Sequence, residues 1–114
     1  MPLLTILTNV DLPAERRQDI ADEASKLVAE LLGKPESYVM IALSHNPDMR
    51  FAGSNDALAY LELKSIDLPQ QDTTRLSDEL CTFIENRMDV DPSRVYIEFA
   101  DAERHMWGWS NATF

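Results

Sequence analysis

The chain has 114 residues, of which 45% are hydrophobic and 26% charged, so it is long enough for one globular domain with a hydrophobic core. Asp and Glu number 20 against 10 Lys and Arg, and the resulting net charge of −10 argues against binding to nucleic acid or to anionic membrane surfaces. The single cysteine, Cys81, excludes an internal disulfide bond. Because no segment has the pattern of a signal peptide or a membrane span, we expect a cytoplasmic protein.

The first half of the sequence predicts a strand, a helix and a second strand. Residues 2–10, PLLTILTNV, have the Leu, Ile, Thr and Val content of a buried strand. A helix begins near Pro13 and ends before Gly33. Its apolar residues fall on one face at helical spacing, namely Ile20, Ala24, Leu27, Val28, Leu31 and Leu32. The second strand is YVMIALS, residues 38–44.

The second half repeats this order. Residues 57–66, ALAYLELKSI, alternate as a strand does, and residues 68–88 predict an amphipathic helix. Its inner face carries Leu76, Leu80, Phe83, Ile84 and Met88. A last strand follows in RVYIEF, residues 94–99. The Leu-Pro pair that opens the first helix recurs before the second, so we interpret 1–114 as a single domain with pseudo-repeats of about 1–57 and 58–114.

This duplication predicts an α/β (α+β) fold built from two β-α-β units. The expected structure is a four-stranded mixed sheet with two helices on one face, in which each crossover pairs its strands in parallel. The strands carry apolar residues on both of their faces. Since an exposed apolar sheet face is usually covered by another copy of the chain, we predict a homo-oligomer.

Two residues near the strand ends could carry chemistry. The small second residue permits removal of Met1, after which Pro2 would begin the chain with a secondary amine tethered to a buried strand. Burial near another cation would lower the pKa of such an amine towards neutrality, as a general base requires. Lys34 directly follows Gly33, where a cation meets the negative end of the helix dipole, and on its own this position favours simple helix capping.

Several motifs together resemble the macrophage migration inhibitory factor family of the tautomerase superfamily. They are MPLLTILTNV, GKPESY, KSI, RVYIEF and GWSNATF, in the family's order and spacing from Met1 to Phe114. The resemblance implies a cofactor-free homotrimer whose sheets surround a central axis. Its sites would lie between neighbouring subunits, and the processed N-terminal proline would be the catalytic base.

The resemblance also assigns roles to residues. Pro2 is the general base and acid, Lys34 grips the substrate carboxylate and keeps the proline neutral, and the backbone N–H of Ile66 contributes to binding. The walls that receive a substrate ring match Tyr38, Tyr96, Trp109 and Phe114. For these aromatic residues, packing in the core or at an interface remains an alternative. The implied substrates are aromatic α-keto acids such as phenylpyruvate or its hydroxylated analogue.

Three positions depart from the family pattern. Glu98 stands where an asparagine is usual, which disfavours an anionic substrate and could raise the pKa of Pro2. Trp107 replaces a smaller valine and could narrow the mouth of the pocket. Residues 58–61 read LAYL in place of a Cys-x-x-Cys pair, so we expect no thiol oxidoreductase activity, and we interpret Cys81 as a small packed residue.

Two other functions stay open. One is a signalling or binding protein with vestigial tautomerase activity, and the other is a different reaction of the superfamily, such as decarboxylation or dehalogenation, with Glu98 as an added acid or base. No metal site is predicted. Asp101, Glu103 and His105 alternate, but we interpret this cluster as solvated loop surface because no second histidine lies nearby.

Overall fold

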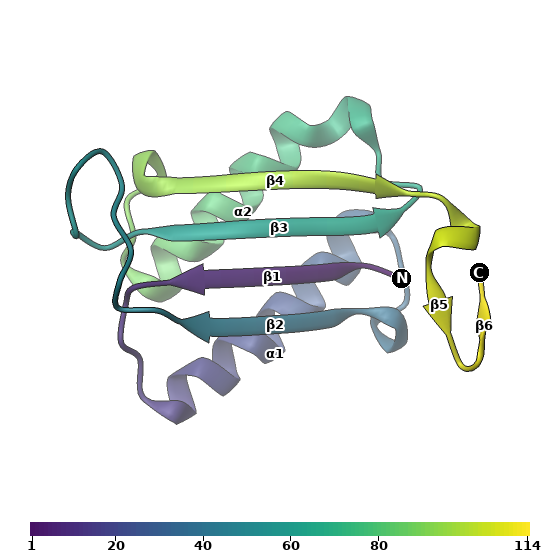
Figure 1. The fold of residues 1–114 in the computed structure, drawn as a ribbon, viewed down its shortest axis with the longest axis horizontal. Helices are drawn as coiled ribbons and strands as arrows, with labels where there is room; N and C mark the ends of the chain where they lie inside the picture. Colours follow the sequence, from purple (N-terminus) through teal and green to yellow (C-terminus); the bar gives the residue numbers. More distant parts are fainter.

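A four-stranded sheet with two helices on one face forms the body of the molecule (Figure 1). The computed structural model describes all 114 residues. The main elements are β1 (Leu3–Thr8), α1 (Ala14–Leu32), β2 (Met40–His45), β3 (Ala59–Ile66), α2 (Thr73–Met88) and β4 (Val95–Ala102). Short 3₁₀ helices cover Glu36–Tyr38, Gln70–Asp72, Pro92–Arg94 and Arg104–Met106. Two short strands, β5 (Gly108–Trp109) and β6 (Ala112–Thr113), end the chain.

The sheet has the strand order β2-β1-β3-β4, which confirms the predicted four-stranded mixed sheet. β1 and β2 are parallel, as are β3 and β4, because a helix carries the chain back between the strands of each pair. The two units join through antiparallel pairing of β1 with β3, in which Leu4 lies opposite Leu63. The first strand of each unit therefore lies in the centre of the sheet.

The core lies between the sheet and the helices. Leu4 and Ile6 of β1 and Leu61 and Leu63 of β3 are fully buried, as their alternation along the strands requires. The helices bury the predicted faces, through Ile20, Ala24 and Val28 in α1 and Leu76, Leu80, Ile84 and Met88 in α2. Leu27, Leu31, Leu32 and Phe83 lie at the margin of this core and are partly buried. Neither helix is long and apolar enough to cross a membrane.

The other face of the sheet is mixed in character, which corrects the expectation of an apolar face. Strand alternation and register place Leu3, Leu7, Met40 and Ala42 on the β1–β2 side of this face. On the β3–β4 side the same rule places Tyr60, Glu62, Lys64, Tyr96 and Glu98. Only every second residue of a strand points to this uncovered face. A run of consecutive apolar residues in the sequence therefore does not make the whole face apolar.

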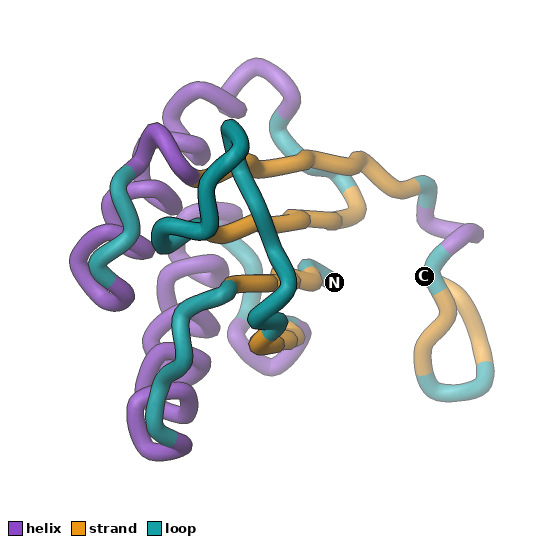
Figure 2. Tube along the Cα trace, turned by 60° about the vertical axis from the view of Figure 1, so that its left-hand side comes forward, coloured by secondary structure: helices purple, strands orange, loops and turns teal.

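The C-terminal hairpin of β5 and β6 was not predicted from the sequence. Its two-residue turn has Ser110 and Asn111 at φ 52° and 64°, the left-handed values that suit tight antiparallel hairpins. Figures 1 and 2 show the hairpin beyond the sheet, at the same end of the strands as the N-terminus. The hairpin and the N-terminus therefore flank the same space.

At the opposite end of the sheet, Arg94 holds the loop between β2 and β3 in place. The Arg94 guanidinium donates hydrogen bonds to the carbonyls of Phe51, Ser54, Asp56 and Ala57 at 3.0–3.2 Å. These bonds fix the loop between β2 and β3 against the start of β4. The loop thereby holds the Phe51 ring 4.6 Å from the ring of Tyr96.

Truncation of the core is the first prediction. Leu61→Ala is expected to lower the free energy of unfolding by about 2–5 kcal/mol, since Leu61 is fully buried between the sheet and both helices. Urea unfolding at a fixed chain concentration measures the effect. Met106, which is 74% exposed, is the matched control, and Met106→Ala is expected to change stability by less than about 0.5 kcal/mol. Equal losses in both variants would contradict this assignment of the core.

Candidate active site

A cavity of about 410 Å³ opens beside the N-terminus, between the start of β2 and the C-terminal hairpin. Most of its lining is apolar, and the lining includes Met1, Pro2, Tyr38, Trp107, Trp109 and Phe114. Four of these residues were singled out from the sequence as site residues, and Trp107 as a departure that shapes the pocket. Segments from both ends of the chain therefore meet in one concave surface.

Pro2 is buried at the entry to β1. Its carbonyl accepts a hydrogen bond from the backbone N–H of Met40 at 2.9 Å, which ties the start of the chain to β2. Burial, and then repulsion from the Lys34 ammonium, hold the pKa of the Met1 amino group below its usual value. A chain-terminal amine in this cavity is thus biased towards its neutral form.

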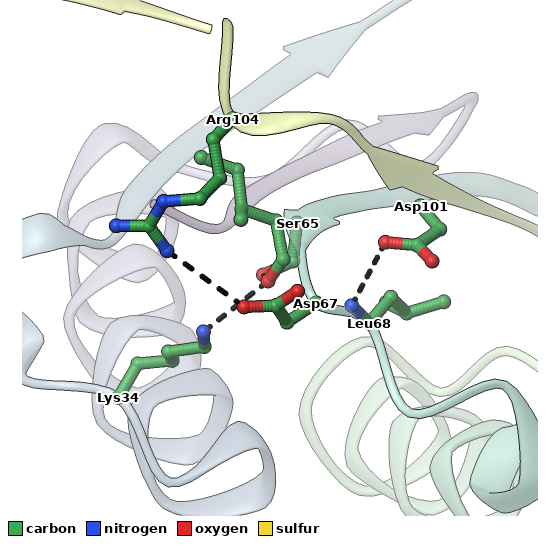
Figure 3. Close-up of polar contacts among 7 residues, drawn as sticks. Lys34, Ser65, Asp67, Leu68, Asp101 and Arg104 are labelled. Atoms are coloured by element: carbon green, nitrogen blue, oxygen red, sulfur yellow. Dashed lines mark hydrogen bonds and ion pairs between the residues drawn. The ribbon is translucent and has the colours of Figure 1, made fainter. Parts of the chain in front are cut away.

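Lys34 belongs to the helix terminus through its backbone. Its side chain and Ile66 do not line the cavity, and Lys34 acts on the N-terminal amine through its charge. Gly33 adopts a left-handed conformation with φ 62°, and the Lys34 backbone N–H donates to the Ala29 carbonyl at 3.0 Å. The Lys34 ammonium donates to the Ile66 carbonyl at 3.2 Å. Figure 3 shows the Lys34 side chain extending from the helix end towards Ser65 and Asp67. Its other donors are available to a ligand carboxylate.

The end of β3 presents Ile66 to this ammonium. Ile66 is fully buried, and its carbonyl also accepts a hydrogen bond from the Ser65 hydroxyl at 2.9 Å. Asp67 then turns the chain with φ 55° and pairs with Arg104 at 3.8 Å (Figure 3). This pair joins the turn to the segment that leads into the C-terminal hairpin.

Asp101 has a structural role, which corrects its interpretation as part of a solvated loop. It lies on β4, where its carboxylate accepts from the Leu68 backbone N–H at 3.1 Å and from the Gln70 side-chain amide at 2.9 Å. Glu103 instead pairs with His105 at 3.5 Å. The chain contains no group of three His, Cys, Asp or Glu side chains arranged to hold a metal ion.

Three aromatic rings form one wall of the cavity. The Trp109 and Phe114 rings stack with centroids 5.5 Å apart, and Tyr38 meets both edge-on at 5.7 and 6.0 Å. These contacts hold the C-terminal hairpin against the 3₁₀ turn that precedes β2. The rings give the cavity a flat apolar surface suited to an aromatic ligand.

Tyr96 and Glu98 do not reach this cavity within one chain. Tyr96 is 67% exposed, and its register partner across the sheet is Tyr60, whose own neighbour on β1 is Leu7. Glu98 accepts a hydrogen bond from the Tyr60 hydroxyl at 2.6 Å. Tyr96 and Glu98, which the sequence analysis assigned to the site, therefore lie on the exposed face, two strands away from β1. Tyr96 lies at the end of the sheet opposite Pro2.

Tyr60 is a candidate functional residue that the sequence reasoning missed. Its hydrogen bond to Glu98, together with desolvation and the nearby Glu62, raises the pKa of the Tyr60 hydroxyl, so this group remains a donor. The alternation Tyr60–Glu62 was visible in the sequence. Its pairing with Glu98 depends on the register of β3 with β4.

Cys81 lies on α2 and is partly buried against the core. Burial raises the pKa of its thiol, which keeps the sulfur protonated and a poor nucleophile. This environment supports the interpretation of Cys81 as a packing residue.

The sequence and the fold of this chain are similar to those of known proteins. A family model described as "Macrophage migration inhibitory factor (MIF)" matches residues 1–114. A macrophage migration inhibitory factor homolog from Brugia malayi is 34% identical, with 100% of this chain and 99% of the relative covered. Among solved structures, a homologue from Prochlorococcus marinus has a TM-score of 0.91 and 37% identity over 98% of each chain. A protein from Entamoeba histolytica has a TM-score of 0.92 and 27% identity, with 99% of this chain and 98% of that chain covered.

The cation at Lys34 generates a prediction about the N-terminal amine. In the form that retains Met1, we expect the pKa of the Met1 amino group to lie below its usual value in the wild-type protein and to rise in Lys34→Met, because the variant removes a charge that disfavours the protonated form. Titration of the N-terminal residue's resonances by NMR measures both values. Lys26→Met removes an exposed cation from α1 and is expected to leave the pKa unchanged. An identical pKa in Lys34→Met and wild type would exclude the proposed repulsion.

Proposed function

Because the chain belongs to the macrophage migration inhibitory factor family, which includes tautomerase-like proteins, we propose that it is a cofactor-free keto–enol tautomerase of aromatic α-keto acids of the phenylpyruvate type. The observation that carries the proposal is the environment of the chain terminus. The Met1 amino group, whose pKa is lowered by burial and by Lys34, lies in a cavity walled by stacked aromatic rings, and Pro2, which begins the chain once Met1 is removed, lines the same cavity. The cavity thus offers a position for a base and a surface for a ring, and the Lys34 ammonium, which does not line the cavity, is close enough to lower the pKa of the amine.

In the proposed reaction, Pro2 acts as the base once Met1 has been removed. Its neutral amine takes the proton from the carbon next to the substrate's keto group and leaves an enolate. The protonated amine then returns this proton to the enolate oxygen, so that the net change is isomerisation without any co-reactant, and ketonisation follows the same steps in reverse. While Met1 remains, the Pro2 nitrogen belongs to an amide and cannot accept a proton.

Lys34 and Ile66 would hold the carboxylate end of the substrate. The Lys34 ammonium already lies at the Ile66 carbonyl, 3.2 Å away, and a carboxylate can bind its remaining donors. The backbone N–H of Ile66 is the second donor in this proposal. The same ammonium lowers the pKa of the Met1 amino group, and in this proposal it acts likewise on the Pro2 amine once Met1 is removed, so that one residue serves both binding and base strength.

Completion of the site requires a second copy of the chain. Members of the family form oligomers, and this chain presents Tyr96 and Met40 as exposed apolar side chains, 67% and 64% accessible, on the uncovered face of its sheet. Tyr96 and Glu98 lie on this face and away from the cavity of their own chain. We therefore propose a homotrimer in which these residues reach the Pro2 cavity of a neighbour.

Replacement of the secondary amine tests the reaction. Pro2→Gly is expected to lower the rate of phenylpyruvate ketonisation by roughly 10²–10⁴-fold, because glycine keeps Met1 removable but replaces the ring-fixed secondary amine with a freely rotating primary amine. The rate is followed by ultraviolet absorbance, and intact mass confirms that Met1 is absent from both proteins.

A form that retains Met1 is the matched control and is expected to be inactive, since it keeps every side chain but has an amide at Pro2. A rate at the level of buffer for the correctly processed wild-type protein would overturn the proposal. The binding-protein alternative would then be favoured.

The assembly generates a separate prediction. Sedimentation equilibrium is expected to give three times the 13.0 kDa chain mass. Met40→Glu places a charge on the β1–β2 side of the uncovered face and is expected to shift the equilibrium towards monomer. Thr82→Glu, on the exposed face of α2, adds the same negative charge away from the sheet and controls for a change in charge alone. A monomeric wild-type protein that is fully active would contradict the shared site.

A further inference from the structure

The loop between β2 and β3 contains a tight turn that one side chain holds. Phe51 and Ser54 exchange backbone hydrogen bonds at 2.9 and 3.0 Å, from the N–H of each residue to the carbonyl of the other. Ala52 and Gly53 lie between them with φ 52° and 75°, left-handed values at both central positions of the turn. The Arg94 guanidinium donates to both carbonyls that close this turn, at 3.2 Å each. Figure 1 shows the loop at the end of the sheet where β4 begins.

Arg94 binds the loop through the shape of its guanidinium and without a carboxylate partner. Two further hydrogen bonds go to the carbonyls of Asp56 and Ala57, so four of its five N–H groups donate to the main chain of the loop. No ion pair in the chain includes Arg94. The Asn9 side chain binds the same loop, but only at residues 55–58. The position of the turn therefore depends on Arg94.

The turn presents the Phe51 ring to Tyr96. The guanidinium carbon of Arg94 lies 5.4 Å from the centroid of the Phe51 ring, and this ring is 4.6 Å from that of Tyr96, at an angle of 53°. Tyr96 is 67% exposed, and Phe51 is the one aromatic ring that contacts it. Both rings line a cavity of about 310 Å³ on the uncovered face of the sheet. The direction of the Tyr96 ring is thus restricted from one side, by a ring that Arg94 fixes.

We propose that Arg94 is a positioning residue, which acts through the Phe51 ring to hold Tyr96 in the direction from which it enters the cavity of a neighbouring copy. This inference rests on the proposed function, since Tyr96 meets a substrate only in the shared site between two copies. Arg94 itself touches no substrate. It lies on the chain that does not supply the amine of that site.

The expected signature is a change in KM. The ring of the substrate keeps its structure throughout the reaction, so a wall that receives it binds the ground state and the transition state alike. A poorly directed Tyr96 therefore raises KM and leaves kcat unchanged, because Pro2 and Lys34 belong to the other chain. A smaller folded or assembled fraction acts differently, since it lowers the apparent kcat and leaves the KM of the remaining sites unchanged.

Replacement of the guanidinium tests the inference. Arg94→Lys keeps the positive charge, but an ammonium cannot bind four carbonyls spread across the plane of a guanidinium. We expect KM for phenylpyruvate to rise about 3- to 10-fold and kcat to stay within about twofold, which corresponds to the loss of one ordered side chain. Arg75→Lys is the matched control, because Arg75 donates to the Leu31 carbonyl on the helix side, and it is expected to keep the wild-type KM.

A second background separates action through Tyr96 from a general effect. In Tyr96→Ala, adding Arg94→Lys is expected to raise KM by less than about 1.5-fold, because the residue on which Arg94 acts is absent. Phe51→Leu keeps the backbone bonds of the turn but removes the ring, and it is expected to raise KM as Arg94→Lys does. All variants are compared at a chain concentration where sedimentation equilibrium gives one common mass.

The outcomes distinguish this inference from the proposed function. If wild type is active and KM is unchanged in both Arg94→Lys and Phe51→Leu, the inference is wrong while the tautomerase proposal stands. The same holds if Arg94→Lys raises KM equally with Tyr96 and with alanine at that position. If wild type does not turn over phenylpyruvate, the proposed function itself has failed.

Discussion

The central position of β1 is the constraint on which the candidate site depends. β1 is hydrogen-bonded on both sides, to β2 and to β3, and it buries Leu4 and Ile6 completely. A strand held in this way cannot slide by one residue without turning its apolar side chains to the opposite face. The start of the chain is thereby fixed at one end of the sheet. A flexible N-terminus, the usual state of a chain end, would leave the terminal amine in water.

The surroundings of that amine come from segments far apart in the sequence. The charge of Lys34 acts on it from the end of α1, where the Lys34 ammonium is held by the Ile66 carbonyl at the end of β3, and the hairpin with Trp109 and Phe114 comes from the end of the chain. Parallel pairing within each β-α-β unit and antiparallel pairing between the units bring these positions to one edge. The same arrangement places Tyr96 at the opposite end of the sheet. Each chain therefore carries two separate parts of the proposed site, the cavity beside Pro2 and the region of Tyr96.

Much of the fold could be predicted because its signals are local. The helix faces of Ile20, Ala24 and Val28 and of Leu76, Leu80 and Ile84 follow from spacing alone, and the structure buries them as expected. The apolar character of the uncovered sheet face was predicted less well. Which residues share this face, Glu62 among them, depends on how the strands pair as well as on alternation along each strand. The C-terminal hairpin was missed because strands of two residues give no periodic signal, and its turn uses Ser110 and Asn111 instead of glycine.

The sequence by itself determined the duplicated units, the strand and helix faces, and the presence of a proline behind a removable methionine. Each of these depends on residues close together in the chain. Only the tertiary structure decided that the Lys34 ammonium meets the Ile66 carbonyl, that Asp101 holds the turn after β3, and that Tyr60 binds Glu98. These contacts join residues more than thirty positions apart, and strand register, which depends on the packing of the whole core, brings such residues within hydrogen-bonding distance.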